Sequence, residues 1–208
     1  MNDRKKNIQN CMLVENPLLV GKYGIPYLHR ENYIPDNIIP FSEIKTTKFK
    51  QYGVHFFIDD YRFERLWSHP YKYLALLKQF SCIFAPDFSL YVDMPPAMKI
   101  WNVYRNRLIG QWLQKMGVRV IPTISWAEPA SFEYCFDGVE TGGTVAVSTV
   151  GAKRNSYTID LWKRGMTALI RTIAPTSILI YGELIDFNFE TIHVKYFNNN
   201  ILNHLHNL

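Results

Sequence analysis

Acidic residues follow four apolar segments of the chain, each at the point where a buried strand is expected to give way to a loop. The segments are residues 54–58, 82–86, 118–126 and 177–181, and the acids are Asp59 with Asp60, Asp87, Glu128 and Glu183. Parallel α/β proteins bind their ligands at the carboxyl ends of their strands. Carboxylates gathered there can transfer protons, attack as nucleophiles or hold a divalent cation. The sequence therefore predicts an active site at one edge of a parallel sheet.

These carboxylates differ in whether a structural role, such as capping a helix, would also explain them. A proline gives the turn before Asp87 a fixed shape, so Asp87 is the strongest catalytic candidate. Glu128 and Glu183 are expected to face the same edge and complete the main catalytic set. Asp59 is a fourth catalytic candidate and Asp60 a substrate-binding one, because neighbouring residues of a strand point to opposite sides. One of this pair has an alternative role as the cap of the helix that follows.

Aromatic, hydroxyl and cationic side chains make up the other candidates for substrate binding. They are Trp126, Tyr181, Ser148, Thr149 and Arg105. A tryptophan close to a carboxylate suits a sugar or a base, because the ring stacks while the carboxylate binds hydroxyl groups or moves a proton. The hydroxyls of Ser148 and Thr149 precede a glycine and two cations, a combination that can hold phosphate. As alternatives, Trp126 covers the rim of the core and Arg105 lies on a solvated helix surface.

Strands and helices are expected to alternate from residue 54 onward. Strands are predicted to begin at residues 54, 82, 118, 144 and 178, which is the spacing of successive βα units. A complete eight-fold barrel usually needs about 250 residues, and this chain has 208. We therefore predict an α/β fold of βα repeats, a truncated or irregular TIM-like barrel. The alternative is an open, doubly wound parallel sheet.

Helix boundaries and the division into domains are also predicted. Residues 1–16 are expected to form a polar N-terminal arm, and residues 17–208 a single α/β domain. A long helix should start at Pro95 or Pro96, and Asp93 and Asp160 are the expected N-caps of this helix and of the last one. The predicted apolar face of the long helix consists of Met98, Trp101, Val103, Leu108, Trp112, Leu113 and Met116. Arg105 and Arg107 of this helix are expected to be exposed.

Charge and composition limit the partners and the cellular location. The chain has 23 Lys and Arg against 18 Asp and Glu, a net charge of +5, which favours an anionic ligand, a nucleotide or nucleic acid. No apolar segment is long enough to span a bilayer, and the polar N-terminus lacks a signal core, so we expect a cytoplasmic protein without a membrane partner. The three cysteines and six histidines lack zinc-ligand spacing, and no metal ligand is assigned. The cofactor and the oligomeric state are not indicated.

The stretch from about Phe57 to Glu183 resembles a family known as domain of unknown function 4417. The segments that carry the resemblance are Phe84–Tyr91, Asn102–Arg107, Ile121–Trp126, Val147–Gly151 and Ile180–Glu183. The family occurs mainly in phages, plasmids and the genomes of Gram-positive bacteria. The resemblance implies a mobile-element protein that acts in a bacterial host cell, and it favours nucleotide or nucleic-acid partners. It transfers no catalytic role to any residue.

Two functions from different classes agree with these patterns. The first is a hydrolase that uses the strand-end carboxylates on O-glycosidic or N-glycosidic bonds, or on phosphoesters with a divalent metal. The alternative is a non-catalytic nucleic-acid-binding accessory protein of a phage or plasmid. Its cations would be Arg4, Lys5, Lys6, Lys45, Lys48, Lys50, Lys153 and Arg154. A protein that blocks or recruits a host partner is a third hypothesis.

Overall fold

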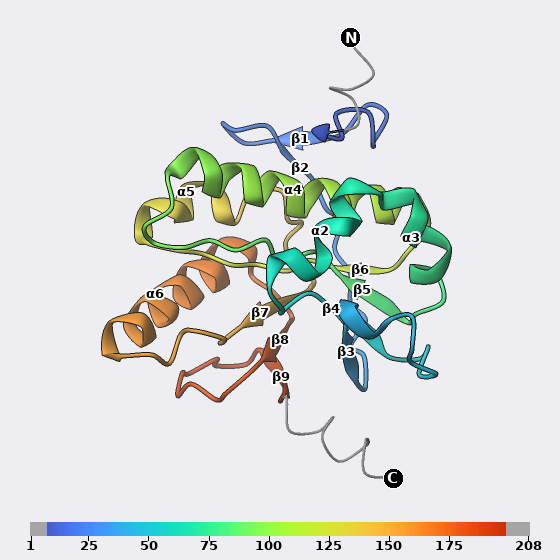
Figure 1. Ribbon diagram of the computed structural model, residues 1–208. Coiled ribbons are helices and arrows are strands. Elements are labelled where there is room, and N and C mark those ends of the chain that lie inside the picture. The colour runs from blue at the N-terminus through green and yellow to red at the C-terminus, as the bar shows by residue number, and fades with distance from the viewer. Residues whose placement is uncertain (1–7, 199–208) are drawn as a thin grey trace.

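Strands and helices alternate along the chain in the computed structural model, which describes residues 8–198 (Figure 1). In chain order the elements are β1 (Leu19–Val20), β2 (Ile25–Pro26), β3 (Ile38–Pro40), η1 (Phe41–Glu43), β4 (Gly53–His55), α2 (Asp60–Ser68), α3 (Pro70–Leu77), β5 (Cys82–Phe84), α4 (Pro96–Lys115), β6 (Val120–Ile121), η2 (Pro129–Ser131), α5 (Phe132–Cys135), β7 (Thr144–Ser148), α6 (Ser156–Ile173), β8 (Ser177–Tyr181) and β9 (His193–Phe197). The five predicted strands begin within two residues of their expected positions.

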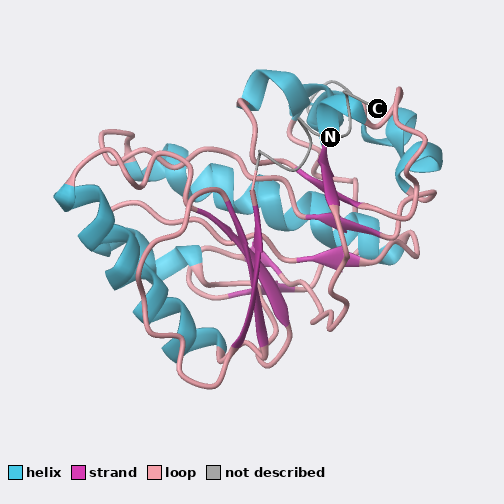
Figure 2. Ribbon diagram, turned by 90° about the horizontal axis from the view of Figure 1, so that it is seen from below, coloured by secondary structure: helices cyan, strands magenta, loops and turns pink. Residues whose placement is uncertain are grey.

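Parallel pairing connects all the strands from β3 to β9. One sheet has the order β3-β4-β5-β6 and the other the order β7-β8-β9. The two sheets are joined where Thr123 pairs with Ala146, and the Ile124 N–H donates to the Ala146 carbonyl at 2.8 Å. The predicted α/β class, built from parallel strands and intervening helices, is therefore confirmed. The helices lie outside the strands, with α6 beside β7–β9 and α2 and α3 beside β3–β5 (Figures 1 and 2).

One apolar cluster collects side chains from β3, β5, β6, β7, β8 and β9 and from the residue Phe57 that follows β4. Its buried members are Ile38, Phe57, Cys82, Phe84, Ile121, Ala146, Leu179, Tyr181 and Phe197. The ring of Tyr181 at the end of β8 lies 4.4 Å from the ring of His55 in β4 and 5.2 Å from that of Phe57. At the other end of the strand order, Lys195 Nζ of β9 donates to the carbonyl oxygen of Pro35, just before β3, at 2.7 Å. Strands that are distant in the order therefore contact one another through their side chains.

Helix α4 crosses the molecule between the strands and the β1–β2 hairpin (Figure 1). Gly110 permits this close approach, because a Cβ there would lie 2.8 Å from Leu28 Cδ2. The predicted face of this helix is wrong in part, because Met98 and Trp101 are exposed. Polar side chains occupy much of the buried face: Lys99, Asn102, Asn106, Arg107 and Gln111. They are stable there because they bind backbone carbonyls and neighbouring side chains.

The helix ends correct two further predictions. Helix α4 has Pro95, not Asp93, at its N-cap. Helix α6 starts before Asp160, at Ser156, because Asn155 accepts a hydrogen bond from the Thr158 N–H at 2.9 Å and forms a capping box with it. Helix α2 ends at Ser68 and α3 begins at Pro70, because a proline fits the first turn of a helix but not its interior.

The first described residues pack against the domain. Leu13 and Val14 are buried in the core cluster that lies between α2, α3, α4 and the sheet. Trp67 Nε1 donates to the Ile8 carbonyl at 3.1 Å, and Asn10 Nδ2 donates to the Trp67 carbonyl at 2.8 Å. Arg4, Lys5 and Lys6 lie outside the described residues. Among residues 8–198, no helix combines the length and hydropathy needed to cross a membrane.

His55 makes the stability of this fold sensitive to acid. The side chain is 1% exposed, and burial lowers its pKa from 6.5 to about 3. Its Nδ1 accepts a hydrogen bond from the Phe57 N–H at 3.2 Å, so the proton resides on Nε2. Below pH 6.5 the unfolded chain binds a proton at this histidine that the folded chain does not, so the contribution of His55 to the free energy of unfolding must fall as the pH falls toward 3.

We expect His55→Gln to remove this dependence on pH. In the wild type, this group lowers the free energy of unfolding by about 2 kcal/mol between pH 7.5 and pH 5, and the variant loses that difference. Urea unfolding at the two pH values measures it. His69→Gln, at an exposed histidine, is the control and should keep the wild-type dependence. An unchanged dependence in His55→Gln would contradict the assignment.

Candidate functional site

Asp87 follows β5 and has the most unusual environment of the predicted carboxylates. The side chain is partly buried, and its Oδ1 is buried without a hydrogen-bond partner among the described residues. Burial raises the pKa of Asp87 from 3.8 to about 7. A hydrogen bond with Ser125 opposes this rise, the negative charge of Asp60 adds to it, and the Arg107 guanidinium opposes it. Asp87 is therefore a carboxyl group that changes its protonation state near neutral pH.

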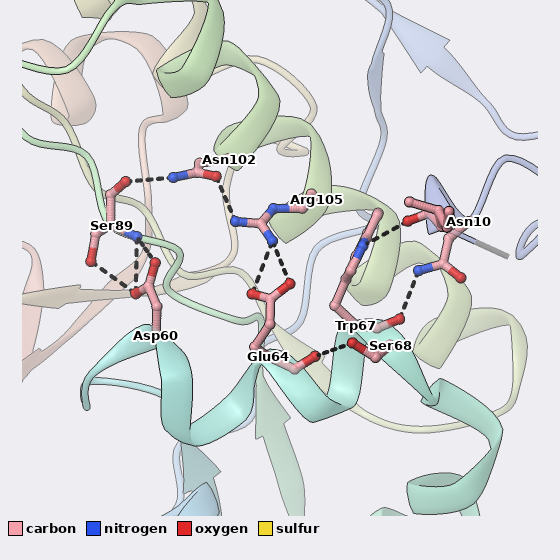
Figure 3. Close-up of polar contacts among 9 residues, drawn as sticks. Asn10, Asp60, Glu64, Trp67, Ser68, Ser89, Asn102 and Arg105 are labelled. Carbon is pink, nitrogen blue, oxygen red and sulfur yellow. Dashed lines mark hydrogen bonds and ion pairs between the residues drawn. The ribbon is translucent and has the colours of Figure 1, made fainter. Parts of the chain in front are cut away.

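Asp60 lies beside this loop and is held by Ser89. Its carboxylate accepts hydrogen bonds from the Ser89 hydroxyl at 2.8 Å and from the Ser89 N–H at 3.1 Å (Figure 3). Asn102 Nδ2 of α4 donates to the Ser89 carbonyl at 2.7 Å from the other side. The loop that carries Asp87 is thus fixed between α2 and α4. Of the carboxylates predicted from the sequence, Asp60 is the one whose negative charge raises the pKa of Asp87.

Arg105 extends the same set of contacts along α4. Its Nη1 donates to both carboxylate oxygens of Glu64, at 2.9 and 3.0 Å, and its Nη2 donates to Asn102 Oδ1 at 2.7 Å (Figure 3). The guanidinium also lies over the ring of Phe88, 3.8 Å from its centroid. The expected exposure of Arg105 is therefore wrong, because its charge is matched inside the protein. In this position it orders the Phe88–Ser89 loop.

Asn106 and Arg107 connect the two strand ends that carry Asp87 and Ser125. Asn106 Nδ2 donates to the Pro86 carbonyl, and Arg107 Nη1 donates to Asn106 Oδ1 at 2.6 Å and to the Thr123 carbonyl at 2.8 Å. Arg107 is 1% exposed, which also corrects its predicted exposure. Burial lowers the pKa of Arg107 to about 10, so the guanidinium stays charged at neutral pH.

Glu128 is bound to a buried cation. Lys99 Nζ of α4 lies 2.5 Å from Glu128 Oε2, and Lys99 is 1% exposed. Burial alone would raise the pKa of Glu128, but the hydrogen bond from Lys99 outweighs it, together with a backbone hydrogen bond and the ammonium charge, and the pKa is lowered. Glu128 therefore remains ionised and neutralises Lys99. This contact ties the loop after β6 to the first turn of α4.

The groups at the ends of β7 and β8 contact one another and solvent. Glu183 is exposed and pairs with Lys153 Nζ at 2.7 Å. The hydroxyl of Thr149 donates to the Glu183 carbonyl at 2.8 Å, and the Ser148 hydroxyl accepts from the Val150 N–H at 3.0 Å. These hydroxyls hold the two loops together. No contact links Glu183 to Asp87 or Glu128 among the described residues.

The remaining predicted side chains point in different directions. Asp59 is at the N-cap of α2 but makes no capping hydrogen bond, and it pairs with Arg62 at 3.5 Å. The Trp126 ring rests on α6, where a Cβ at Gly165 would lie 2.0 Å from the indole Nε1. Tyr181 is buried beside His55 and Phe57. A cavity of about 590 Å³ lies elsewhere, between residues 12–16, Tyr71 and the end of α4.

Sequence reasoning did not identify the polar residues that support Asp87. Ser125 was part of a strand segment, and Ser89 and Asn102 belonged only to the family-like segments. A usable signal was present in α4, where Lys99, Asn102 and Asn106 recur at spacings of three and four residues. That spacing places them on one helix face. Among residues 8–198, no group of three His, Cys, Asp or Glu side chains is arranged to hold a metal ion.

Comparison with known proteins assigns the chain to a family. The chain belongs to the family described as Domain of unknown function (DUF4417), which matches residues 18–198. It is similar to the Gene 1 protein of Mycobacterium phage L5, with 40% identity over 165 residues that cover 78% of this chain and 72% of the phage protein. The Gene 1 protein of Mycobacterium phage D29 is 38% identical over 165 residues, covering 78% of this chain and 61% of that protein. The resemblance inferred from sequence is confirmed, and the chain is a phage-associated protein. No solved structure matches it.

The titration of Asp87 is open to direct measurement. We expect its carboxyl carbon to titrate near pH 7 when followed by carbon-13 NMR. Asp60→Asn should lower this midpoint because it removes a neighbouring negative charge, and Ser125→Ala should raise it because it removes a hydrogen bond to the carboxylate. Glu183→Gln is the control and should leave the midpoint unchanged. A midpoint near 4 in the wild type would contradict the description of the site.

Glu128 and Glu183 should differ in their effect on stability. Glu128→Gln leaves the ammonium of Lys99 buried without a counter-charge, and we expect the free energy of unfolding to fall by about 2–3 kcal/mol. Glu183→Gln removes an exposed pair and should change it by less than about 0.5 kcal/mol. Urea unfolding at pH 7 measures both. Equal effects of the two substitutions would show that the Lys99–Glu128 pair does not hold the loop.

Proposed function

We propose that this protein is a hydrolase in which Asp87 transfers the proton, and that its substrate bond is O-glycosidic or N-glycosidic. The observation that carries the proposal is the Asp87 carboxyl itself. It has a pKa of about 7, follows a parallel strand, and has one oxygen without a partner. A general acid or base works best when its pKa is close to the operating pH. A carboxyl group in ordinary solvent contact would be ionised at neutral pH and could not act as an acid.

The two carboxylates have separate roles in this proposal. Protonated Asp87 donates its proton to the leaving oxygen or nitrogen as the bond to the sugar carbon breaks. Asp60, held by the hydroxyl and the N–H of Ser89, supplies negative charge near the positive charge that develops on the sugar. Ionised Asp87 then accepts a proton from the water that attacks the sugar. Ser125 orients the Asp87 carboxyl throughout.

We also propose that the strands close into an irregular TIM-like barrel. In a flat sheet, β4 and β8 would be four positions apart, roughly 19 Å at the usual strand spacing. The ring of His55 in β4 nevertheless lies 4.4 Å from the ring of Tyr181 in β8. The contact of Lys195 with the Pro35 carbonyl supports closure between β9 and β3. An open, doubly wound sheet, the alternative predicted from sequence, would keep these groups apart.

Metal-assisted phosphoester chemistry has less support at this site. The carboxylates predicted from the sequence pair with different cations: Glu128 pairs with Lys99, and Glu183 pairs with Lys153. The described residues do not supply a set of three ligand side chains. No step of the proposed reaction is therefore assigned to a metal.

The non-catalytic alternative, nucleic-acid binding through basic side chains, is supported by a different part of the molecule. Lys45 and Lys48 are exposed and form no ion pair among the described residues. Lys153 is less available to bind a phosphate group, because its Nζ pairs with Glu183 at 2.7 Å. Binding of this kind does not require Asp87 and can accompany the hydrolase activity.

Activity assays test the proposed chemistry. The wild-type chain is incubated with nitrophenyl glycosides, nucleosides and single-stranded DNA, and the released nitrophenol or base is quantified. We expect Asp87→Asn to lower the rate by at least about 100-fold and Glu183→Gln to leave it unchanged. The pH–rate profile should have an inflection near pH 7 that moves to lower pH in Asp60→Asn. An Asp87→Asn variant with full activity would refute the proposal, as would a wild-type chain that releases no product.

A further inference from the structure

We infer that this protein binds single-stranded nucleic acid on a surface separate from the Asp87 site. The surface, named here the basic patch, is formed by Lys45, Lys48, Phe49, Lys50 and Arg65. The first four residues lie in the connection between β3 and β4, and Arg65 lies on α2. The inference does not rest on the chemistry proposed for Asp87.

Two cations of the basic patch share one aromatic ring. Lys45 Nζ lies 5.7 Å from the centroid of the Tyr73 ring, and the Arg65 guanidinium carbon lies 5.9 Å from the same centroid. Arg65 is also 5.3 Å from the ring centroid of Phe41. Both cations are exposed, and neither forms an ion pair within residues 8–198. A bound anion would be attracted to both of these positive charges.

The lysines on the other side of the patch are also without carboxylate partners in the described part of the chain. Lys50 Nζ donates to the Ile44 carbonyl at 3.0 Å and lies 4.4 Å from the centroid of the Phe80 ring. These contacts hold the ammonium in place and leave its charge unneutralised. Lys48 is exposed. The patch therefore presents four positive charges that are available to phosphate groups.

Phe49 lies between Lys48 and Lys50 and adds an exposed aromatic ring to the charges of the patch. The ring is 42% exposed and stacks on Tyr52, with 5.0 Å between the centroids and 9° between the planes. The turn is fixed because the Phe49 N–H donates to Thr47 Oγ1 at 3.1 Å. An exposed ring backed by a second ring and flanked by cations is the arrangement on which unpaired bases stack. A duplex keeps its bases stacked internally, so the patch favours a single strand.

The acidic residues near the patch do not cancel it. Glu64 of α2 binds Arg105 of α4 with both carboxylate oxygens (Figure 3) and forms no ion pair with a cation of the patch among the described residues. Glu43 of η1 forms no ion pair with these cations. At the strand ends, by contrast, the cations are neutralised, because Arg62 is paired with Asp59 and Lys153 with Glu183. A polyanion is therefore attracted to the patch more strongly than to the Asp87 edge.

Fluorescence anisotropy with a labelled 20-nucleotide oligo(dT) and a labelled 20-base-pair duplex tests the inference. We expect the wild-type chain to bind the single strand more tightly than the duplex. Lys45→Ala/Arg65→Ala should weaken binding and reduce the slope of log K against log salt by about 1.4, or 0.7 for each lost phosphate contact. Phe49→Ala should weaken binding to the single strand about 10-fold. All three residues are exposed, so circular dichroism should report an unchanged fold.

Matched substitutions on other surfaces serve as controls. Arg164→Ala/Arg171→Ala on α6 removes the same number of exposed charges, and Tyr157→Ala removes an aromatic ring that is 58% exposed. Both should bind oligo(dT) as the wild type does. Asp87→Asn should also bind normally, which separates this inference from the proposed hydrolysis. The inference is overturned if the wild type does not bind oligo(dT), if the duplex binds equally well, or if the control substitutions weaken binding as much as those in the patch.

Discussion

The buried polar side chains of α4 determine where the surrounding loops can lie. A helix that buries Lys99, Asn102, Asn106, Arg107 and Gln111 must give each of them partners, because an unpaired polar group in the interior costs several kcal/mol. The partners are mostly backbone carbonyls of irregular segments, including Pro86, Ser89 and Thr123. These segments follow short strands and have few regular hydrogen bonds of their own. The helix therefore gives them the order that a longer strand would otherwise provide.

Asp87 owes its unusual state to this arrangement. The nearby amide of Asn106 is bound to the Pro86 carbonyl, and the guanidinium of Arg107 is shared among three backbone carbonyls and Asn106. Neither group is left to neutralise the carboxylate directly. Burial then acts on Asp87 with only Ser125 to oppose it by hydrogen bonding, and the negative charge of Asp60 adds to the effect. The donors of Asn106 and Arg107 therefore stabilise the loops and are not used to bind the Asp87 carboxylate.

Much of the fold was predictable because strands and helices with one apolar side leave a periodic pattern. The strand positions and the parallel α/β class follow from such patterns. The orientation of α4 does not follow from its pattern. Such a pattern assumes that buried residues are apolar, whereas this helix buries cations and amides. For the site, the sequence located Asp87 and Asp60 at strand ends. It did not show that Lys99 would pair with Glu128, 29 residues away, or that Lys153 would pair with Glu183. Such pairings depend on side-chain directions in three dimensions.

The contact between Lys195 and the Pro35 carbonyl has a consequence for association between molecules. A strand at the border of a sheet exposes a row of free N–H and carbonyl groups, which can pair with a strand of another copy and start aggregation. Here the side chains of Ile38 in β3 and Phe197 in β9 share one apolar cluster, and the ammonium of Lys195 bridges the gap beside it. Side chains of β3 and β9 therefore lie beside both of these borders. A charged side chain here also makes the approach of a strand from another copy unfavourable, so the contact of Lys195 with Pro35 protects the chain against association through these strands.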